Sequence, residues 1–252
     1  MNTFKHSGSF GDLIYSLPLV KHFGGGEFYL HLNQIDWIGQ HYYGSPPTPF
    51  HQGRLTESDF VYMKDFMMAQ SYISKFDIMD IKNTAITHNL DKFRTPFVGH
   101  PGNYVDIYSN VFGITDNIEK TQIRTTPWLT VPSKNKVANL VVNRTERWIA
   151  NPIPTQWANI IESYPTSVFV GLPHEYEKFV KDTGCKIDYY PTQTLLEVAS
   201  VIAGADMYMG NQSSGLAVAI GLGVPFTCEL RRELPLDRNE CYFPNQPNGQ
   251  YF

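Results

Sequence analysis

Residues 206–222, DMYMGNQSSGLAVAIGL, give the clearest indication of the fold of this chain. A short apolar run predicts a strand, a small polar turn follows it, and the small apolar residues after the turn predict a helix. The same order recurs through the second half of the chain. Strands are expected over 139–143, 167–172, 186–190, 206–210 and 225–230, and helices over 155–164, 174–183, 194–203 and 214–222. Such alternation predicts a parallel sheet that is covered on both faces.

The first half repeats this pattern in a weaker form. Strands are expected over 3–6, 27–32 and 76–81, and helices over 12–23, 56–72 and 103–112, the first of them bent at Pro18. The segment 125–136, TTPWLTVPSKNK, has two prolines and a polar run that are typical of a linker. We therefore expect two Rossmann-like domains, residues 1–130 and 131–252, with a cleft between them. Residues 38–56 fit neither element and are expected to form a loop over that cleft.

The composition of the 252 residues limits the classes of function. Hydrophobic residues make up 42% of the chain, which is enough to build cores, and the net charge of −4 argues against a whole-surface fit to nucleic acid or to an anionic membrane. We expect a cytoplasmic protein, because the start lacks a signal-peptide core and no apolar run is long enough to cross a bilayer. The three cysteines form no CxxC and the histidines no HExxH, so neither a disulfide scaffold nor a metal site is expected.

Residues 6–13, HSGSFGDL, join a predicted strand to a predicted helix. Gly8 and Gly11 let the backbone approach a ligand closely, and the start of a helix favours anions. Asp12 lies in the first turn of that helix. It either stabilises the helix through the macrodipole or serves as a general base facing the cleft. The dinucleotide fingerprint GxGxxG is absent from this turn, which disfavours a nicotinamide-dependent dehydrogenase.

The turn after the predicted strand 206–210 also has two possible interpretations. It is either a plain capped helix start or a cradle of backbone N–H groups for a diphosphate. On the second reading the donor-binding residues are Gly210, Asn211, Gln212, Ser213, Ser214 and Gly215.

Basic residues follow other strands of the same predicted sheet. Arg144 and Arg147 come just after the strand 139–143, at the edge where ligands bind in open α/β sheets. They are either a surface pair or the groups that neutralise a leaving diphosphate. Gly171 reaches the same edge from the strand 167–172, and Gly171 and Gly11 are further predicted donor-binding residues. Arg231 and Arg232 follow the last strand and offer a further basic pair there.

Taken together, these motifs resemble the lipopolysaccharide heptosyltransferase family of glycosyltransferases. Residues 9–18, SFGDLIYSLP, look like the family's opening motif, with Gly11 and Asp12 as its core. The family's late pattern is matched with equal spacing by 195–199 (LLEVA), Ala205-Asp206, 210–213 (GNQS) and 223–225 (GVP). The likeness covers about residues 1–24 and 137–230.

The resemblance implies a GT-B architecture, with the nucleotide-sugar donor on the C-terminal domain and the acceptor on the N-terminal one. It implies inverting transfer without a metal or other cofactor. The aspartate matching Asp12 would deprotonate the acceptor hydroxyl. The loop matching residues 212–214 would hold the donor diphosphate, and the basic position near Arg147 would offset the charge of the leaving nucleotide.

Two departures from the family pattern bear on function. Gln212 stands where the family has aspartate, and Ala217 where it has histidine. We therefore expect a donor other than ADP-heptose. A short, aromatic-rich chain of this kind would suit a phage or accessory glycosyltransferase, whose acceptor is a glycan or a hydroxylated base in DNA. Two alternatives stay open: a degenerate protein that binds a nucleotide or glycan without catalysis, and a GT-B enzyme of another class such as a nucleotide-sugar epimerase.

Overall fold

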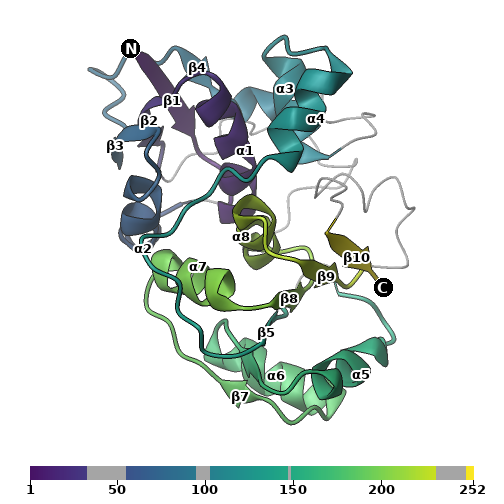
Figure 1. Cartoon of the computed structure of the whole chain (residues 1–252). Helices are drawn as coiled ribbons and strands as arrows, with labels where there is room; N and C mark the ends of the chain where they lie inside the picture. The colour runs from purple at the N-terminus through teal and green to yellow at the C-terminus, as the bar shows by residue number, and fades with distance from the viewer. Residues whose placement is uncertain (33–54, 95–102, 147–148, 231–247) are drawn as a thin grey trace.

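The computed structural model describes residues 1–32, 55–94, 103–146, 149–230 and 248–252, and it has two halves (Figure 1). The first half contains β1 (Asn2–His6), α1 (Phe10–His22), β2 (Gly26–Leu30), α2 (Glu57–Met68), β3 (Ile73–Ile78), β4 (His88–Asn89), the 3₁₀ helix η3 (Leu90–Arg94), α3 (Tyr104–Val111) and α4 (Asn117–Thr125). The second contains β5 (Leu140–Asn143), α5 (Gln156–Ser163), β6 (Ser167–Phe169), α6 (Pro173–Thr183), β7 (Asp188–Tyr189), α7 (Leu195–Gly204), β8 (Met207–Gly210), α8 (Ser214–Leu222), β9 (Phe226–Cys228) and β10 (Gly249–Tyr251).

Each half has its own parallel sheet. The strand order is β3-β2-β1-β4 in the first sheet and β10-β9-β8-β5-β6-β7 in the second. In both, the chain starts in the middle of the sheet, moves outward on one side and then crosses to the other side. This is the strand order of a doubly wound Rossmann-like sheet. The predicted α/β fold with two parallel sheets is confirmed.

Helices cover both faces of the second sheet, and the alternation along β5 shows how. Leu140 and Val142 are fully buried in a cluster with Trp157 of α5 and Phe179 of α6. Val141, which points to the opposite face, belongs to the cluster that includes residues of α7 and α8. Because successive side chains of a strand point to opposite faces, a short apolar strand of this kind is buried on both sides.

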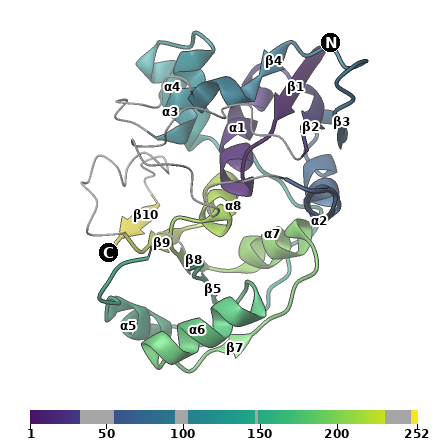
Figure 2. The same cartoon turned by 180° about the vertical axis from the view of Figure 1, so that it is seen from behind.

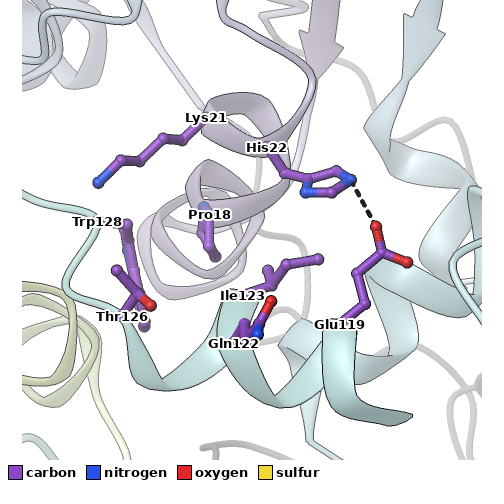
Figure 3. Close-up of a pocket in the computed structure, with 8 residues that line it drawn as sticks. All are labelled: Pro18, Lys21, His22, Glu119, Gln122, Ile123, Thr126 and Trp128. Carbon is purple, nitrogen blue, oxygen red and sulfur yellow. Dashed lines mark ion pairs between the residues drawn. The ribbon is translucent and has the colours of Figure 1, made fainter. Parts of the chain in front are cut away.

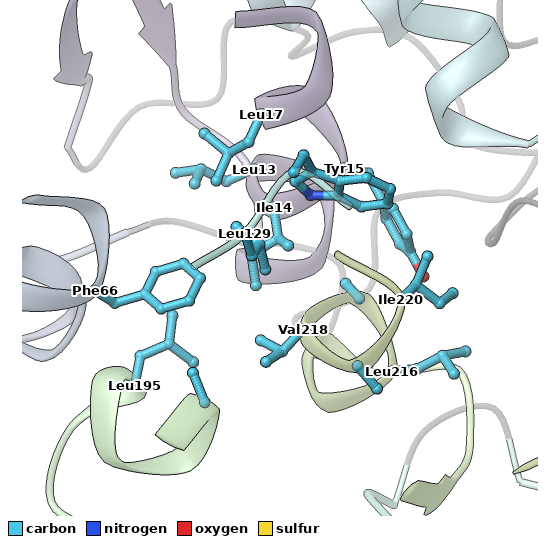
Figure 4. Close-up of a cluster of buried hydrophobic side chains, with 14 of the residues drawn as sticks. Leu13, Ile14, Tyr15, Leu17, Phe66, Leu129, Leu195, Leu216, Val218 and Ile220 are labelled. Atoms are coloured by element: carbon cyan, nitrogen blue, oxygen red, sulfur yellow. The ribbon is translucent and has the colours of Figure 1, made fainter. Parts of the chain in front are cut away.

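The two halves pack directly on one another. Figures 1 and 2, seen from opposite sides, both place α1 beside α8 and α2 beside α7. The contact is apolar: Leu13 and Leu17 of α1, Phe66 of α2, Leu195 of α7 and Val218 of α8 are buried in one continuous cluster (Figure 4). The described parts of the two halves therefore share a hydrophobic core.

The predicted linker is anchored to this interface. Beyond Thr125 it contains no helix or strand, yet Trp128 is 1% exposed and Leu129 is buried. Both residues donate their backbone N–H to the carbonyl of Gly221, at 2.9 and 2.8 Å. The strands of the first sheet precede this segment in the chain and those of the second sheet follow it. The domain boundary after residue 130 stays a prediction.

Several predicted bounds were wrong. The helix predicted over 56–72 ends at Met68, and the strand predicted over 76–81 is β3, which begins three residues earlier. After α2 the buried side chain of Gln70 binds the backbone of Phe66 and Thr130, so the chain turns there instead of continuing as a helix. Helix α1 begins at Phe10 and runs through Pro18 to His22. Strands β4 and β10 and helix α4 were not predicted. Residues 38–54 of the predicted loop lie outside the described residues.

Candidate active site

A cavity of about 480 Å³ lies between the two halves, in the size range of small-molecule sites. Its second-half side is the carboxyl edge of the sheet, where Asn143 at the end of β5 pairs with Gly210 at the end of β8. The strand order reverses between these two strands, which are therefore the topological switch point of the sheet. Open α/β sheets bind ligands at such a switch point. The lining residues are Phe10, Ser58, Asp59 and Tyr62 from the first half, and Val141, Asn143, Thr145, Val170, Gly171, Leu172, Glu175, Thr192, Leu195, Val198, Ile202, Tyr208, Ser214 and Gly215 from the second.

The start of α8 borders this cavity through Ser214 and Gly215. The N-cap residue, Ser213, does not cap the helix with its side chain; its hydroxyl instead donates to Oδ1 of Asn143, at 3.0 Å. Asn143 in turn donates from Nδ2 to the carbonyl of Val170, at 2.7 Å. The first N–H groups of a helix have no intrahelical acceptor, so this arrangement suits an anion.

Three predicted donor-binding glycines have a packing reason to be glycine. A Cβ at Gly210 would lie 2.3 Å from the hydroxyl oxygen of Tyr208, and one at Gly215 would lie 2.5 Å from it. A Cβ at Gly171 would lie 2.9 Å from Nδ2 of Asn143. Gly171 and Gly215 also line the cavity, whereas Gly210 does not. Their part in donor binding stays a prediction.

Asn211 and Gln212 are not among the residues that line the cavity. Asn211 is fully buried and clamps the loop after β5: its Oδ1 accepts the N–H of Thr145 at 3.0 Å, and its Nδ2 donates to the carbonyl of Thr145 at 3.1 Å. Gln212 is 8% exposed. Asn211 thus holds together the two loops at the switch point, which is a structural role that the sequence did not predict.

Asp12 lies in the first turn of α1, two residues after Phe10, and is 7% exposed. A buried hydrogen-bond chain fixes this turn. The N–H of Gly8 donates to Nδ1 of His6 at 2.9 Å, and Nε2 of His6 lies 2.7 Å from the hydroxyl of Tyr108. The Tyr108 hydroxyl donates to the carbonyl of Asp12 at 3.0 Å. Because Nδ1 of His6 accepts, Nε2 carries the ring proton and donates it to Tyr108.

Gly11 differs from the glycines of the second half. A Cβ built on it meets no described atom within 4 Å, and its φ is not in the left-handed region. Neither packing among the described residues nor backbone conformation therefore requires glycine at this position. Close approach of a bound molecule to the backbone beside Asp12 would require it.

Arg144, predicted to face a diphosphate, is buried in an ion pair with Glu229. Its Nε lies 2.6 Å from Oε2 and its Nη2 lies 2.9 Å from Oε1 of that carboxylate. Glu229 also accepts the N–H of Ala150 and the indole N–H of Trp157. Arg144 is not among the residues that line the cavity, and its role as a donor ligand stays a prediction. Arg147, Arg231 and Arg232 lie outside the described residues.

The sequence analysis did not identify the aromatic and acidic side chains that line the cavity. Phe10 and Tyr62 stack, with ring centroids 5.6 Å apart, and Asp59 and Glu175 add two carboxylates. Burial, and then the negative charges of Glu175 and Glu197, raise the pKa of Tyr62 to about 12. Glu175 carried a usable signal, since it follows β6 at the carboxyl edge of the sheet. The place of Tyr62 depends on how α2 packs against α7, which no local pattern shows.

A second cavity, of about 350 Å³, lies at the opposite end of α1 (Figure 3). It is lined by the last turns of α1 and by α4, and Nε2 of His22 lies 3.3 Å from Oε1 of Glu119 across it. The sequence predicted no site there. Across the described ranges, no group of three or more His, Cys, Asp and Glu side chains is arranged to hold a metal ion. None of the helices in the described part of the chain is long and apolar enough to cross a membrane.

No protein-family model and no curated protein matches this sequence. Its fold does match solved structures. The ADP-heptose LPS heptosyltransferase II of E. coli aligns over 100% of this chain and 90% of its own, with a TM-score of 0.60 and 11% identity. A family 9 glycosyl transferase from Veillonella parvula DSM 2008 aligns over 99% and 84%, with a TM-score of 0.54 and 13% identity. The iron-containing dodecameric glycosyltransferase TibC from enterotoxigenic E. coli H10407 aligns over 97% and 61%, with a TM-score of 0.54 and 15% identity. The chain therefore has the fold that the motif resemblance implied.

Proposed function

We propose that this chain is a glycosyltransferase that moves a sugar from a nucleoside-diphosphate-sugar donor to an acceptor hydroxyl. The observation that carries the proposal is the cavity at the switch point of the second sheet. The start of α8 borders it on one side, and the start of α1, two residues before Asp12, borders it on the other. The fold shared with glycosyltransferases supports the same conclusion.

The reaction follows from these positions. The donor diphosphate binds at the start of α8, whose backbone N–H groups and macrodipole stabilise the charge that develops as it leaves. Asp12 takes the proton of the acceptor hydroxyl as its oxygen attacks the anomeric carbon and the bond from that carbon to the phosphate oxygen breaks. Attack from the face opposite the diphosphate inverts the anomeric centre. Because a helix start stabilises the leaving group, the proposal includes no metal.

The test begins with donor binding. A thermal-shift panel of UDP-, GDP-, ADP-, CMP- and dTDP-sugars, with and without Mg²⁺, finds the nucleotide that stabilises the protein. Transfer is then followed by mass spectrometry in EDTA. Asp12→Asn is expected to abolish transfer and to keep the donor-induced shift, whereas Asp65→Asn, which changes an exposed carboxylate of α2, keeps both. Full transfer by Asp12→Asn would contradict the role of Asp12 as the base.

A second candidate function is binding of a nucleotide or glycan without turnover. Gln212 favours it, because this buried amide stands where the resembling family has a carboxylate. A donor-induced thermal shift with no product from any acceptor supports this candidate, and product formation that requires Asp12 excludes it.

The acceptor panel should separate glycans from DNA. We propose a glycan hydroxyl as the first choice, because the net charge of −4 does not favour a polyanion. A duplex that carries 5-hydroxymethylcytosine tests the alternative, a hydroxylated base in DNA. Transfer to that duplex and to no glycan would identify the alternative as correct.

A further inference from the structure

We infer that the cavity of about 350 Å³ at the end of α1 is a second ligand site, and that it binds a small organic anion with an apolar body, such as an aryl carboxylate. The inference does not depend on the proposed function. Phe10 at the start of α1 lines the cavity between the two halves, whereas Lys21 and His22 at its end line this one. Because an α-helix rises about 1.5 Å per residue, the two ends of this 13-residue helix lie about 18 Å apart. A small ligand at one end therefore does not fill the cavity at the other.

The floor of this second cavity is apolar. Pro18 of α1, Ile123 of α4 and Trp128 of the segment between the halves line it, and all three are buried (Figure 3). The backbone of Trp128 is fixed at both of its polar groups. Its N–H donates to the carbonyl of Gly221 at 2.9 Å, and its carbonyl accepts from the hydroxyl of Tyr72 at 2.9 Å. The floor is therefore preformed, and it offers an apolar surface to the body of a ligand.

The rim of the cavity carries hydrogen-bond donors. Lys21, Gln122 and Thr126 line it, and all three are exposed. Nζ of Lys21 donates to the carbonyl of Pro127 at 3.0 Å, and within the described part of the chain it forms no ion pair. Because an ammonium has three N–H donors, this bond leaves donors for a ligand. The amide of Gln122 and the hydroxyl of Thr126 add further donors at the same rim.

The charges around the cavity favour an anion. Glu119, the acidic residue of the lining, faces His22, with 3.3 Å between its Oε1 and Nε2 of the imidazole. Figure 3 shows this pair on one side of Pro18 and Lys21 on the other. A carboxylate between Lys21 and Thr126 would meet an ammonium that has no charged partner among the described residues, and it would stay apart from Glu119. Hydrogen bonds between such ions are stronger than those between neutral groups.

The test uses benzoate as the probe, with benzamide as its uncharged analogue and benzylamine as its cationic one. Calorimetry is carried out at concentrations up to about 10 mM, because ligands of this size bind weakly. We expect benzoate to bind more tightly than either analogue. Lys21→Met should raise the Kd of benzoate about tenfold, whereas Lys21→Arg, which keeps the charge, should change it less than about threefold. Lys181→Met is the matched control, since Lys181 is also an exposed lysine in the last turn of a helix, α6.

A second variant tests the location of the site. Gln122→Trp changes an exposed residue of α4 and places a large side chain in the cavity. It should abolish the binding of benzoate and keep the thermal stability of wild type, because substitutions of exposed residues change stability little. This variant leaves Lys21 and its bond to Pro127 in place, so it separates occupation of the cavity from loss of that bond.

Each of the other outcomes would overturn the inference. If benzoate does not bind, the cavity is not a site for this class of ligand. If it binds with the same Kd to wild type, Lys21→Met and Gln122→Trp, the anion is held elsewhere, for instance at the start of α8. If Lys181→Met weakens binding as much as Lys21→Met, the effect is one of general surface charge. Benzamide or benzylamine that binds as tightly as benzoate would exclude selection for an anion. The proposed function is tested separately, by the panel of nucleotide sugars.

Discussion

Arg144 and Glu229 form a buried two-point ion pair, with 2.6 Å between Nε and Oε2, that ties the loop after β5 to the end of β9. The side chain of Arg144 is 3% exposed and that of Glu229 is fully buried. The two strands are separated by β8, so the pair bridges three strands at the carboxyl edge of the sheet. It holds in place the edge that borders the candidate active site.

Loss of one partner of this pair should destabilise the protein strongly. Glu229→Gln leaves the buried Arg144 guanidinium with only the carboxylate of Asp182, 4.0 Å from Nη1, as a counter-charge, and we expect a loss of about 3 kcal/mol in the free energy of unfolding. Urea unfolding measures it. The double variant Arg144→Met/Glu229→Gln should recover part of the loss, because it removes the buried charge as well. A variant Glu229→Gln that is fully stable but has lost donor binding would instead place Arg144 among the donor ligands.

The second half of the fold could be predicted from sequence because its central strands are short and mostly apolar and alternate regularly with helices. In the first half the local signals were weaker. Helix α4 was missed because Ile123 is its one buried residue, so its apolar periodicity is faint. The bounds of α2 and β3 depend on the side chain of Gln70, which binds the backbone 60 residues away at Thr130. A contact of that range leaves no mark in the local sequence.

Tyr108 should affect the rate of transfer through the position of Asp12. Tyr108→Phe keeps the ring but removes the hydroxyl that donates to the carbonyl of Asp12 and accepts from His6. We expect a loss of about 1–3 kcal/mol in stability, and a transfer rate about tenfold lower with an unchanged donor Kd. Ser109→Ala is the matched control, since it removes a buried hydroxyl of the same helix that binds Val105. Equal rates in the two variants would argue against a positioning role.

The candidate site could be predicted only as a set of loops at one sheet edge. The strand–turn–helix motifs pointed to the starts of α1 and α8, and Phe10, Ser214 and Gly215 from these starts line the cavity, whereas Asp12 is not among the lining residues and its role stays a prediction. They could not show that Gly210 and Gly215 make room for Tyr208, or that Arg144 is matched by Glu229. Tyr208 lies two residues before Gly210 on β8 and contacts the start of α8, and Glu229 follows β9; both contacts depend on how buried side chains pack, which the local sequence does not show.

Two glycine substitutions should have opposite effects. A Cβ at Gly221 would lie 2.5 Å from Cδ1 of Leu129 and 2.8 Å from Nε1 of Trp128, so Gly221→Ala should lower stability by about 1–3 kcal/mol. Gly11→Ala meets open space in a helix, so it should leave stability unchanged or raise it by up to about 1 kcal/mol. If substrate approaches the backbone there, Gly11→Ala lowers transfer nonetheless. Thermal unfolding and transfer assays on both variants check this, and a destabilised Gly11→Ala would contradict it.

Tyr62 should make stability fall at alkaline pH. Its pKa is raised from 10.0 to about 12, first by burial and then by Glu175 and Glu197, so between these values the folded protein keeps a proton that the unfolded chain loses. The stabilisation is complete below pH 10 and is lost as the pH rises through 12. Because the unfolded chain loses the Tyr62 proton first, the free energy of unfolding should be about 1.4 kcal/mol lower at pH 11 than at pH 9.

Tyr62→Phe removes this titration and keeps the ring, so it isolates the effect. The free energy of unfolding of wild type should fall by about 1.4 kcal/mol more than that of Tyr62→Phe between pH 9 and pH 11, as measured by urea unfolding at each pH. Tyr72→Phe cannot serve as a control, because burial raises the pKa of Tyr72 as well. Val218→Ala is a suitable control, because this buried apolar residue has no titratable group. The stability that it loses should be the same at pH 9 and pH 11. Parallel pH profiles for wild type and Tyr62→Phe would show that the pKa of Tyr62 is not raised in the folded protein.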